Sequence, residues 1–431
     1  MISLAHKIIK RNPCTAISPA GKLKLYLVQL SIAVASFFLR KKEIPWVFEE
    51  NPRTMKLKEL LFFAYKYYVR NYYTGKPADF CKVSNKQIQV NDANDDADFI
   101  RINVAGDLMP YALINEQTCE NLWKEKASFF EADIVVANLE TPIYVEKEMN
   151  LVPELMLSNM DFNSSETQFK IFNGNAAKAQ YDVLSFANNH SLDMGYEGAK
   201  KTHSFLERKN IAICGIGING THAMIERKGI KVAFLAYTFS LNQYEKDPNE
   251  DLKINVLPLN LPEGCDISPI VNEVEQVRTA GADIVVLMLH TGNAYQPYPG
   301  KQTQKLFKEI SATIRVDAII GGHPHNIQPL QIFENQGHKT FACYSLSDFI
   351  AYDIYDRCHL SLDLQLVIKG TSGKAKLTEV KVNANYMEYK NNQLILRDFD
   401  AMIANDEIGK DKKLLDLQWL YNSTILNPMH N

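Results

Sequence analysis

The sequence predicts an α/β fold built around a largely parallel sheet. Between residues 99 and 368, short apolar stretches rich in β-branched residues alternate with stretches of helical periodicity. Near-continuous apolar strands of this kind are typical of a sheet that is covered by helices on both faces. Polar side chains repeatedly follow these strands at their carboxyl ends, which is the edge where open α/β sheets bind ligands.

We expect one large domain at 95–385, a helical N-terminal extension at 1–90, and a C-terminal extension at 386–431 that ends in a helix. The chain of 431 residues exceeds the usual size of a single small core, whereas α/β domains of about 250 residues are common. Its hydrophobic share of 46% and charged share of 23% are ordinary for a soluble globular protein.

The extension contains two apolar stretches, at 25–39 and 57–73, with helical spacing. The first has only 15 residues, and because a bilayer span needs about 20, it predicts a buried or interfacial helix. The second carries a stripe of Phe and Tyr that favours packing against the first helix or the main domain, with a membrane-facing surface as the alternative. The acidic, Asn-rich stretch at 89–99 predicts a solvated linker.

The charge of the chain is unevenly distributed. Residues 1–80 carry a formal charge of +9 and the rest carries −12. A basic, aromatic-rich segment suits an anionic membrane surface, whereas the acidic remainder argues against a nucleic-acid partner.

The elements of the main domain are expected in a regular alternation. Strands are predicted at 99–106, 133–139, 181–187, 211–217, 230–238, 282–290, 316–322, 340–346 and 360–368, and helices near 115–129, 167–178, 195–208, 268–280 and 301–313.

The seven cysteines show neither CxxC pairs nor zinc-finger spacing. This pattern predicts reduced, mostly buried thiols without a disulfide framework, as in a reducing compartment. It favours a cytoplasmic or membrane-associated protein over one at the cell surface.

Five of the predicted strands are followed by side chains that can bind metal. These residues are Asp107, Asn138, Glu140, Asn189, His190, His290, His323 and His325. Each alone could be a turn former, a helix cap or a structural histidine, but five strands would bring them to one sheet edge. Nitrogen and oxygen ligands without thiolate suit Mn²⁺, Fe or Zn²⁺. We expect one divalent metal, or two that share a bridging ligand.

The segments that carry these residues resemble the motif series of the CapA family of poly-γ-glutamate capsule biosynthesis proteins. They read GDLMP, NLETP, ANNHSLDMGYEG, LHTG, GGHPHNIQP and YSLSDF, and they extend over residues 99–368. The family is similar to the calcineurin-like metallophosphoesterases. The resemblance implies a four-layer α/β/β/α sandwich with a metal centre at the strand ends.

The resemblance also implies roles for individual residues. The metal ligands would be Asp107, Glu140, Asn189, His290, His323 and His325. His190 would be the general acid, and Asp193 would either orient it or cap the following helix. Asn138, Asn188, Tyr295 and Gln328 would lie toward the substrate, and Asn188 could also orient His190 or a ligand.

Several positions depart from the expected patterns. Met109 stands where phosphoesterases have a metal-binding histidine, and Asn138 where they have an aspartate. The segments after two later strands also differ from the family, at Thr291, Ala294, Ser347 and Asp348. These losses bear on the identity of the substrate more than on the metal.

The expected function is a metal-dependent hydrolase of the capsule biosynthesis type. Its substrate would be a phosphoester, or an amide or ester bond of a cell-envelope polymer such as poly-γ-glutamate, because metal activation of water serves either bond. The alternative is a non-catalytic component of a polymer synthesis or export complex, which uses the metal site for binding and residues 1–80 to contact a membrane or a partner.

Overall fold

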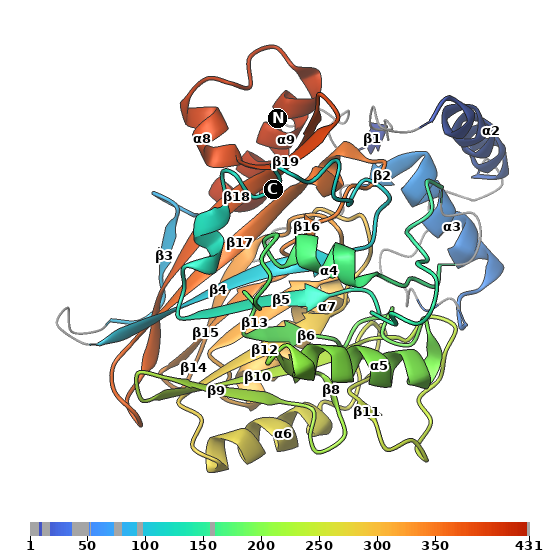
Figure 1. Cartoon of the computed structure of the whole chain (residues 1–431). Helices are drawn as coiled ribbons and strands as arrows, with labels where there is room; N and C mark the ends of the chain where they lie inside the picture. The colour runs from blue at the N-terminus through green and yellow to red at the C-terminus, as the bar shows by residue number, and fades with distance from the viewer. Residues whose placement is uncertain are drawn as a thin grey trace.

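The computed structural model describes residues 8–10, 18–36, 51, 53–72, 80–92, 98–155 and 160–428 (Figure 1). Residues 93–97 of the predicted linker lie outside these described residues.

Two sheets dominate the structure. The nine-stranded sheet has the order β19-β18-β17-β4-β5-β6-β7, with β16 attached to β4 and β3 attached to β18. Its strands are β3 (Gln87–Gln89), β4 (Phe99–Leu108), β5 (Ile134–Leu139), β6 (Val183–Ser185), β7 (Ala212–Cys214), β16 (Asp348–Ile350), β17 (Leu360–Lys369), β18 (Lys376–Lys390) and β19 (Gln393–Asp398). The run β4-β5-β6-β7 is parallel, whereas β17, β18 and β19 are antiparallel.

The second sheet has six strands in the order β14-β15-β13-β12-β10-β9. They are β9 (Ala223–Arg227), β10 (Ile230–Thr238), β12 (Ile284–His290), β13 (Ala318–Gly322), β14 (Leu330–Asn335) and β15 (His338–Cys343). In this sheet a parallel centre is flanked by an antiparallel strand at each edge. Two small sheets pair β1 (Ile8–Lys10) with β2 (Arg70–Tyr72), and β8 (Ile216–Gly217) with β11 (Lys253–Ile254).

Three apolar clusters separate the layers. The largest lies between the sheets and joins residues such as Val104 of β4 to Phe234 of β10 and Val286 of β12. A second packs the outer face of the nine-stranded sheet against helices α4 (Glu166–Phe172) and α5 (Gly195–Arg208). The third packs the outer face of the six-stranded sheet against α6 (Ser268–Thr279) and α7 (Lys301–Thr313). The predicted four-layer α/β/β/α sandwich is therefore confirmed.

One predicted helix is wrong. Residues 115–126 form successive turns, and only Ala127–Phe130 form a short 3₁₀-helix. The main chain there bonds to the sheet edge, where the N–H groups of Leu394 and Leu396 in β19 donate to the carbonyls of Thr118 and Leu122. These contacts with a distant strand replace the hydrogen bonds that a helix would make within itself.

The predicted boundary at residue 385 falls inside β18, so the sheet continues into the C-terminal segment. After β19, that segment forms α8 (Phe399–Ala404), α9 (Lys412–Tyr421) and a π-helical turn at Asn422–Leu426. Phe399, Met402 and Leu417 join the cluster between the sheets.

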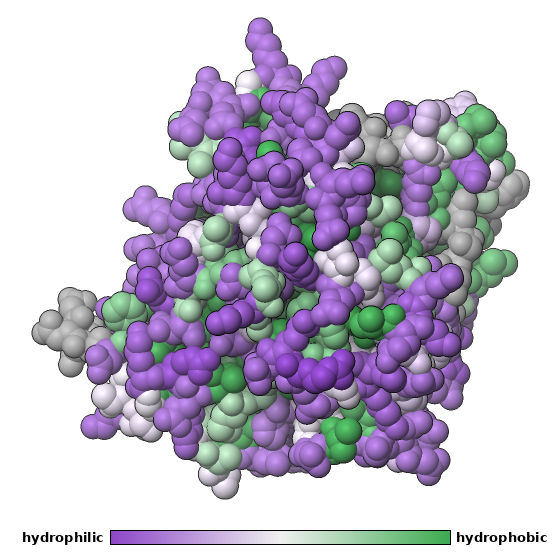
Figure 2. Space-filling model, in the orientation of Figure 1, coloured by the Kyte–Doolittle hydropathy of each residue, from purple (hydrophilic) through white to green (hydrophobic). Residues whose placement is uncertain are grey.

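The N-terminal extension contains helices α2 (Pro19–Ser36) and α3 (Leu57–Tyr68). Phe62, Tyr67 and Tyr68 of α3 are buried, which confirms that its aromatic stripe packs. No helix in the described part of the chain is long and apolar enough to span a membrane. Figure 2 shows apolar groups at the upper right, where α2 lies. The exposed apolar residues of α2 are Leu23, Tyr26, Leu27, Leu30 and Val34.

Candidate metal centre

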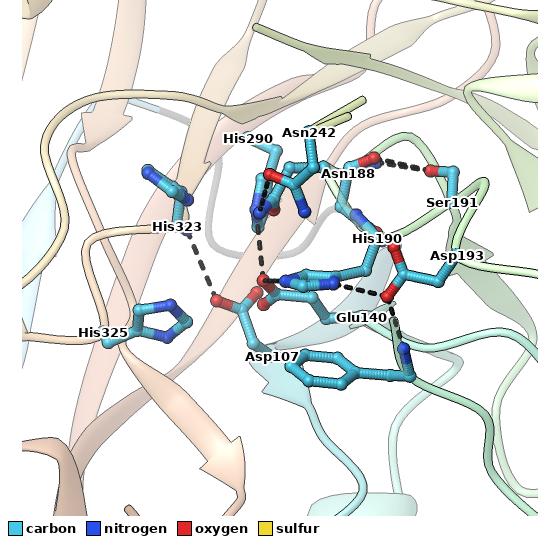
Figure 3. A network of polar contacts seen from close by, with 12 residues as sticks. Asp107, Glu140, Asn188, His190, Ser191, Asp193, Asn242, His290, His323 and His325 are labelled. Carbon is cyan, nitrogen blue, oxygen red and sulfur yellow. Dashed lines mark hydrogen bonds and ion pairs between the residues drawn. The ribbon is translucent and has the colours of Figure 1, made fainter. Parts of the chain in front are cut away.

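The parallel strands place the predicted site residues side by side. In the nine-stranded sheet, Asp107 at the end of β4 pairs in register with Asn138 of β5. In the six-stranded sheet, His290 at the end of β12 pairs with Gly322 of β13. Because the carboxyl ends of parallel strands meet at one edge, both sheets present their polar residues to the same place (Figure 3).

The nine-stranded sheet contributes buried carboxylates and amides. Asn138 Nδ2 donates to Asp107 Oδ1 at 2.8 Å, and Asn188 Nδ2 donates to Asn138 Oδ1 at 3.2 Å. Asn188 also donates to the carbonyl of Leu139 at 2.8 Å. These bonds fix the orientation of Asp107, whose side chain is fully buried.

The six-stranded sheet contributes the histidines. His323 and His325 flank a proline and adopt positive φ angles of 89° and 49°. Such angles are rare for residues other than glycine and persist where surrounding structure enforces them, often at functional sites. The main-chain N–H of His323 donates to Asp107 Oδ2 at 3.3 Å, so the loop is tied to the opposite sheet. Gly322 leaves room for this approach, since a Cβ there would lie 3.1 Å from Asp107 Oδ1.

His290 lies between the two sheets. Its Nε2 is 2.7 Å from Asn189 Oδ1 and 3.4 Å from Glu140 Oε1, and Asn189 is itself held by Asn242 at 3.1 Å. Burial lowers the pKa of His290 to about 3, so the ring is neutral, as a metal ligand must be.

His190 and Asp193 form a buried pair. His190 Nδ1 lies 2.6 Å from Asp193 Oδ2, and the ring stacks on Phe162 with centroids 4.0 Å apart. The N–H of Phe162 also donates to Asp193 at 2.6 Å, which fixes the carboxylate. Burial lowers the pKa of His190, but the facing Asp193 outweighs it and raises the pKa above its usual value. The other ring nitrogen, Nε2, lies 4.0 Å from Glu140 Oε1.

A second histidine–carboxylate pair joins His325 to Asp348. Nδ1 of His325 is 2.6 Å from Asp348 Oδ1, and both side chains are buried. Burial opposes a charged ring, yet Asp348 raises the pKa of His325 to about 10 in the metal-free protein. With Nδ1 held by a carboxylate, Nε2 is left for a metal, which is the usual arrangement of a histidine ligand and its supporting acid.

The arrangement fits a divalent cation. Two groups bring their ligand atoms within 4.8 Å of one another, namely Glu140 with His290 and His323, and Asp107 with His325 and Asp348. Among the described residues, neither carboxylate oxygen of Glu140 accepts a hydrogen bond, although both are buried. Unsatisfied buried carboxylates are costly unless a cation balances them. Burial and the neighbouring Glu140 likewise raise the pKa of Asp107 to about 8.

Tyr295 and Gln328, expected near the substrate, lie at the margin of the cluster. The ring of Tyr295 stacks on His325 with centroids 5.4 Å apart, whereas Gln328 donates to the carbonyl of Gln296 at 2.8 Å. Their contact with a substrate stays a prediction, as do the metal and catalytic roles of the residues in the cluster.

Sequence reasoning missed two members of the site. Asp348 is singled out in the sequence only as a departure from the family pattern, but it lies in one of the two ligand groups. Asn242, which holds Asn189, follows β10 in a loop that carries no recognisable motif. The sequence does contain an indication of Asp348, since it too is a polar residue that lies between two predicted apolar strands, 340–346 and 360–368.

Several solved structures align with parts of this chain at low sequence identity. NAD nucleotidase of Haemophilus influenzae is 15% identical, with a TM-score of 0.41 over 76% of this chain and 67% of that chain. The calcineurin-like phosphoesterase YfkN from Bacillus subtilis is 11% identical, with a TM-score of 0.36 over 77% of this chain and 100% of that chain.

Two curated proteins are similar in sequence. The PGA biosynthesis protein CapA of Bacillus subtilis (strain 168) is 24% identical over 298 residues, which are 66% of this chain and 72% of that protein. The capsule biosynthesis protein CapA of Bacillus anthracis is 24% identical over 294 residues, which are 66% of this chain and 67% of that protein. The family model described as bacterial capsule synthesis protein PGA_cap matches residues 101–353. This match covers more than half of the chain, and the protein therefore belongs to the PGA_cap family of bacterial capsule synthesis proteins.

Proposed function

We propose that this protein is a metal-dependent hydrolase that works in capsule biosynthesis. The observation that carries the proposal is the meeting of two ligand groups with a buried histidine–aspartate pair at one edge of the sandwich. A purely structural site would need neither the pair nor carboxylate oxygens without hydrogen-bond partners among the described residues.

The residues that would hold the metal are those of the two ligand groups. Glu140, His290 and His323 would hold one divalent cation, and Asp107 and His325 a second, with Asp348 orienting His325. Manganese, iron and zinc all accept such nitrogen and oxygen ligands. When bound, the metal would polarise the scissile group and lower the pKa of a coordinated water.

His190 would act as the general acid. Asp193 holds Nδ1 and favours the protonated ring, so Nε2 presents a proton toward Glu140 and the ligand groups. From there the proton can pass to the leaving oxygen as the bond breaks. The stack on Phe162 helps to fix the orientation of the ring.

The substrate would be a phosphoester, or an amide or ester bond in a cell-envelope polymer. Family membership points toward capsule metabolism, and two relatives carry names that refer to PGA or capsule biosynthesis. The departures at Thr291 and Ala294 fall on the loop after β12, beside Tyr295, where substrate contacts are expected. Substrate preference is therefore the property in which this chain would differ from its relatives.

A substrate screen tests the proposal. The purified protein would be loaded with Mn²⁺, Fe²⁺ or Zn²⁺ and assayed on p-nitrophenyl phosphate, bis-p-nitrophenyl phosphate and γ-glutamyl p-nitroanilide. We expect metal-dependent release of nitrophenol or nitroaniline that the His325→Ala substitution abolishes while the circular dichroism spectrum is retained. The matched control is His338→Ala in β15, outside the ligand groups, which should leave the rate unchanged. Equal rates in wild type and His325→Ala would refute the proposed mechanism.

A non-catalytic role in a synthesis or export complex is the second candidate. The exposed apolar residues of α2, together with the basic character of residues 1–80, favour contact with a membrane surface or a partner. Co-sedimentation with anionic vesicles tests the membrane form of this candidate. Binding that Leu27→Asp and Leu30→Asp abolish would support it, and absence of binding by the wild type would oppose it.

A further inference from the structure

The N-terminal helices contact the loops that surround the metal centre. Ser18, at the start of α2, donates to the carboxylate of Glu154 in the loop after β5. Arg53, just before α3, forms an ion pair with Glu245 in the loop after β10. Both loops follow the carboxyl ends of strands, on the edge where the ligand groups lie.

Tyr67 of α3 contacts two aromatic residues in the loops that surround the metal centre. Its ring lies 4.5 Å from that of Tyr295 in the loop after β12, and 5.0 Å from that of Tyr355 in the loop after β16. Tyr295 in turn stacks on His325. A continuous row of rings therefore leads from the N-terminal extension to a ligand residue.

These contacts form a cluster separate from the three cores of the sandwich. It combines residues of the extension with residues of the surrounding loops: Leu25, Tyr67, Tyr68, Leu155, Ala294, Tyr295, Ile354, Tyr355 and Cys358. None of its members belongs to the other three clusters, to which the extension contributes only through residues after α3, such as Phe80 and Val83. Helices α2 and α3 can therefore move away without opening the cores of the sandwich. The contacts of Ser18 with Glu154 and of Arg53 with Glu245 are exposed to solvent, so these two contacts contribute little to holding the extension in place.

The centre is closed in this arrangement. Asp107 and Glu140 are fully buried, and His323 and His325 are 6% and 7% exposed. A substrate must touch these side chains, and the exposed fractions show that little of them is accessible. Some part of the surroundings must therefore move before a substrate can reach the ligand groups.

We infer that helix α3 is a gate for the metal centre, and that Tyr67 is the residue that closes it and positions Tyr295 on His325. The identity of the molecules that pass the gate, substrate and metal, rests on the proposed function. It goes beyond the family resemblance, since the family match begins at residue 101, after the gate. The gate would select substrates by the opening that α3 allows, so a bulky substrate would depend on its movement more than a small one.

Hydrogen–deuterium exchange of the full-length, metal-free protein tests the gate without any assumption about catalysis. In Tyr67→Ala we expect amide exchange at 293–298 and 352–358 to be about tenfold faster or more, because the loops lose their cover. Tyr67→Phe keeps the ring and should exchange like the wild type. Residues 284–289 in β12 serve as the internal control, since they should stay protected in every variant. Unchanged exchange in the loops of a folded Tyr67→Ala protein would overturn the inference.

A second variant covers the case in which Tyr67→Ala fails to fold. Glu154→Gln combined with Glu245→Gln releases both polar contacts without touching a buried residue. Faster exchange at 57–68 and in the same loops would support the gate, and exchange identical to that of the wild type would contradict it.

Metal release and kinetics provide further readouts. Manganese should leave Tyr67→Ala faster than wild type when chelator is added, and kcat/KM should rise more for bis-p-nitrophenyl phosphate than for p-nitrophenyl phosphate. Equal release rates together with equal gains for both esters would argue against a gate. If no hydrolysis is found in any variant, the proposed function fails, while the exchange experiment still decides the gate.

Discussion

Replacing Asp348 with asparagine removes the negative charge that faces His325 and keeps the shape of the side chain. In the metal-free protein, Asp348 raises the pKa of His325 from 6.5 to about 10, against the effect of burial. This rise corresponds to about 5 kcal/mol of preference for the charged ring in the folded state. Without Asp348, only the smaller effects of Glu140 and Asp107 still raise the pKa against burial, and we expect the pKa of His325 to fall well below 10 in Asp348→Asn.

The same pair makes stability depend on pH. Because the pKa of folded His325 exceeds its unfolded value of 6.5, the contribution is fully present below pH 6.5 and is lost as pH rises through about 10. Breaking a buried ion pair costs about 3–5 kcal/mol, and asparagine keeps an acceptor, so we expect the lower end, about 3 kcal/mol, at pH 6. Above pH 10 the difference between the two proteins should vanish or reverse.

Two measurements check this prediction on protein freed of metal by chelation. Urea unfolding of wild type and Asp348→Asn at pH 6 and above pH 10 gives the difference in the free energy of unfolding at each pH. NMR of histidine-labelled protein follows the ring of His325 directly. The reasoning is refuted if the difference in stability is the same at both pH values, or if the pKa of His325 stays near 10 in the variant.

Three further predictions follow from the same site. His190→Gln and Asp193→Asn should each lower kcat by about 10²- to 10⁴-fold without changing the metal content. Steady-state kinetics measures the first and elemental analysis the second, and loss of metal in either variant would show that the substituted residue is a metal ligand. Glu140→Gln should weaken metal binding by about tenfold or more, because it removes one of the buried charges. Isothermal titration calorimetry with Mn²⁺ would measure the change in the dissociation constant. Gly106→Ala should lower the free energy of unfolding by about 1–3 kcal/mol, since the Cβ of the new alanine would overlap the carbonyl oxygen of Ser347. An unchanged thermal midpoint would show that β4 and β16 are not as closely spaced as described.

Elements governed by local spacing could be predicted closely from the sequence. Helices α5 and α7 coincide with the predicted ranges 195–208 and 301–313, because each needs only a periodic apolar face to pack on its sheet. The turns at 115–126 could not be predicted, since their main chain bonds to β19, more than 270 residues away. Nor does the alternation of strands and helices say that there are two sheets; that expectation came from the family resemblance.

The site shows the same division between local and distant signals. The rule that polar residues follow parallel strands predicted that Asp107, His290 and His325 would meet at one edge, and the two ligand groups contain all three. The place of Asp348 in the site could not be predicted, because it depends on the contact with His325. That residue precedes Asp348 by 23 positions and contacts it only in the folded chain. The gate formed by Tyr67 could not be predicted for a similar reason. An aromatic stripe on a helix indicates that the helix packs against another part of the protein, but it does not indicate which part.

Elemental analysis of the purified protein tests the central claim most directly. Wild type and the His323→Ala/His325→Ala double variant would be supplied with Mn, Fe and Zn, dialysed, and compared for metal per chain. The account predicts about one to two metals in the wild type and a marked loss in the double variant, with its circular dichroism retained. A wild type that stays empty after metal is supplied, or a double variant that holds as much as the wild type, would contradict it.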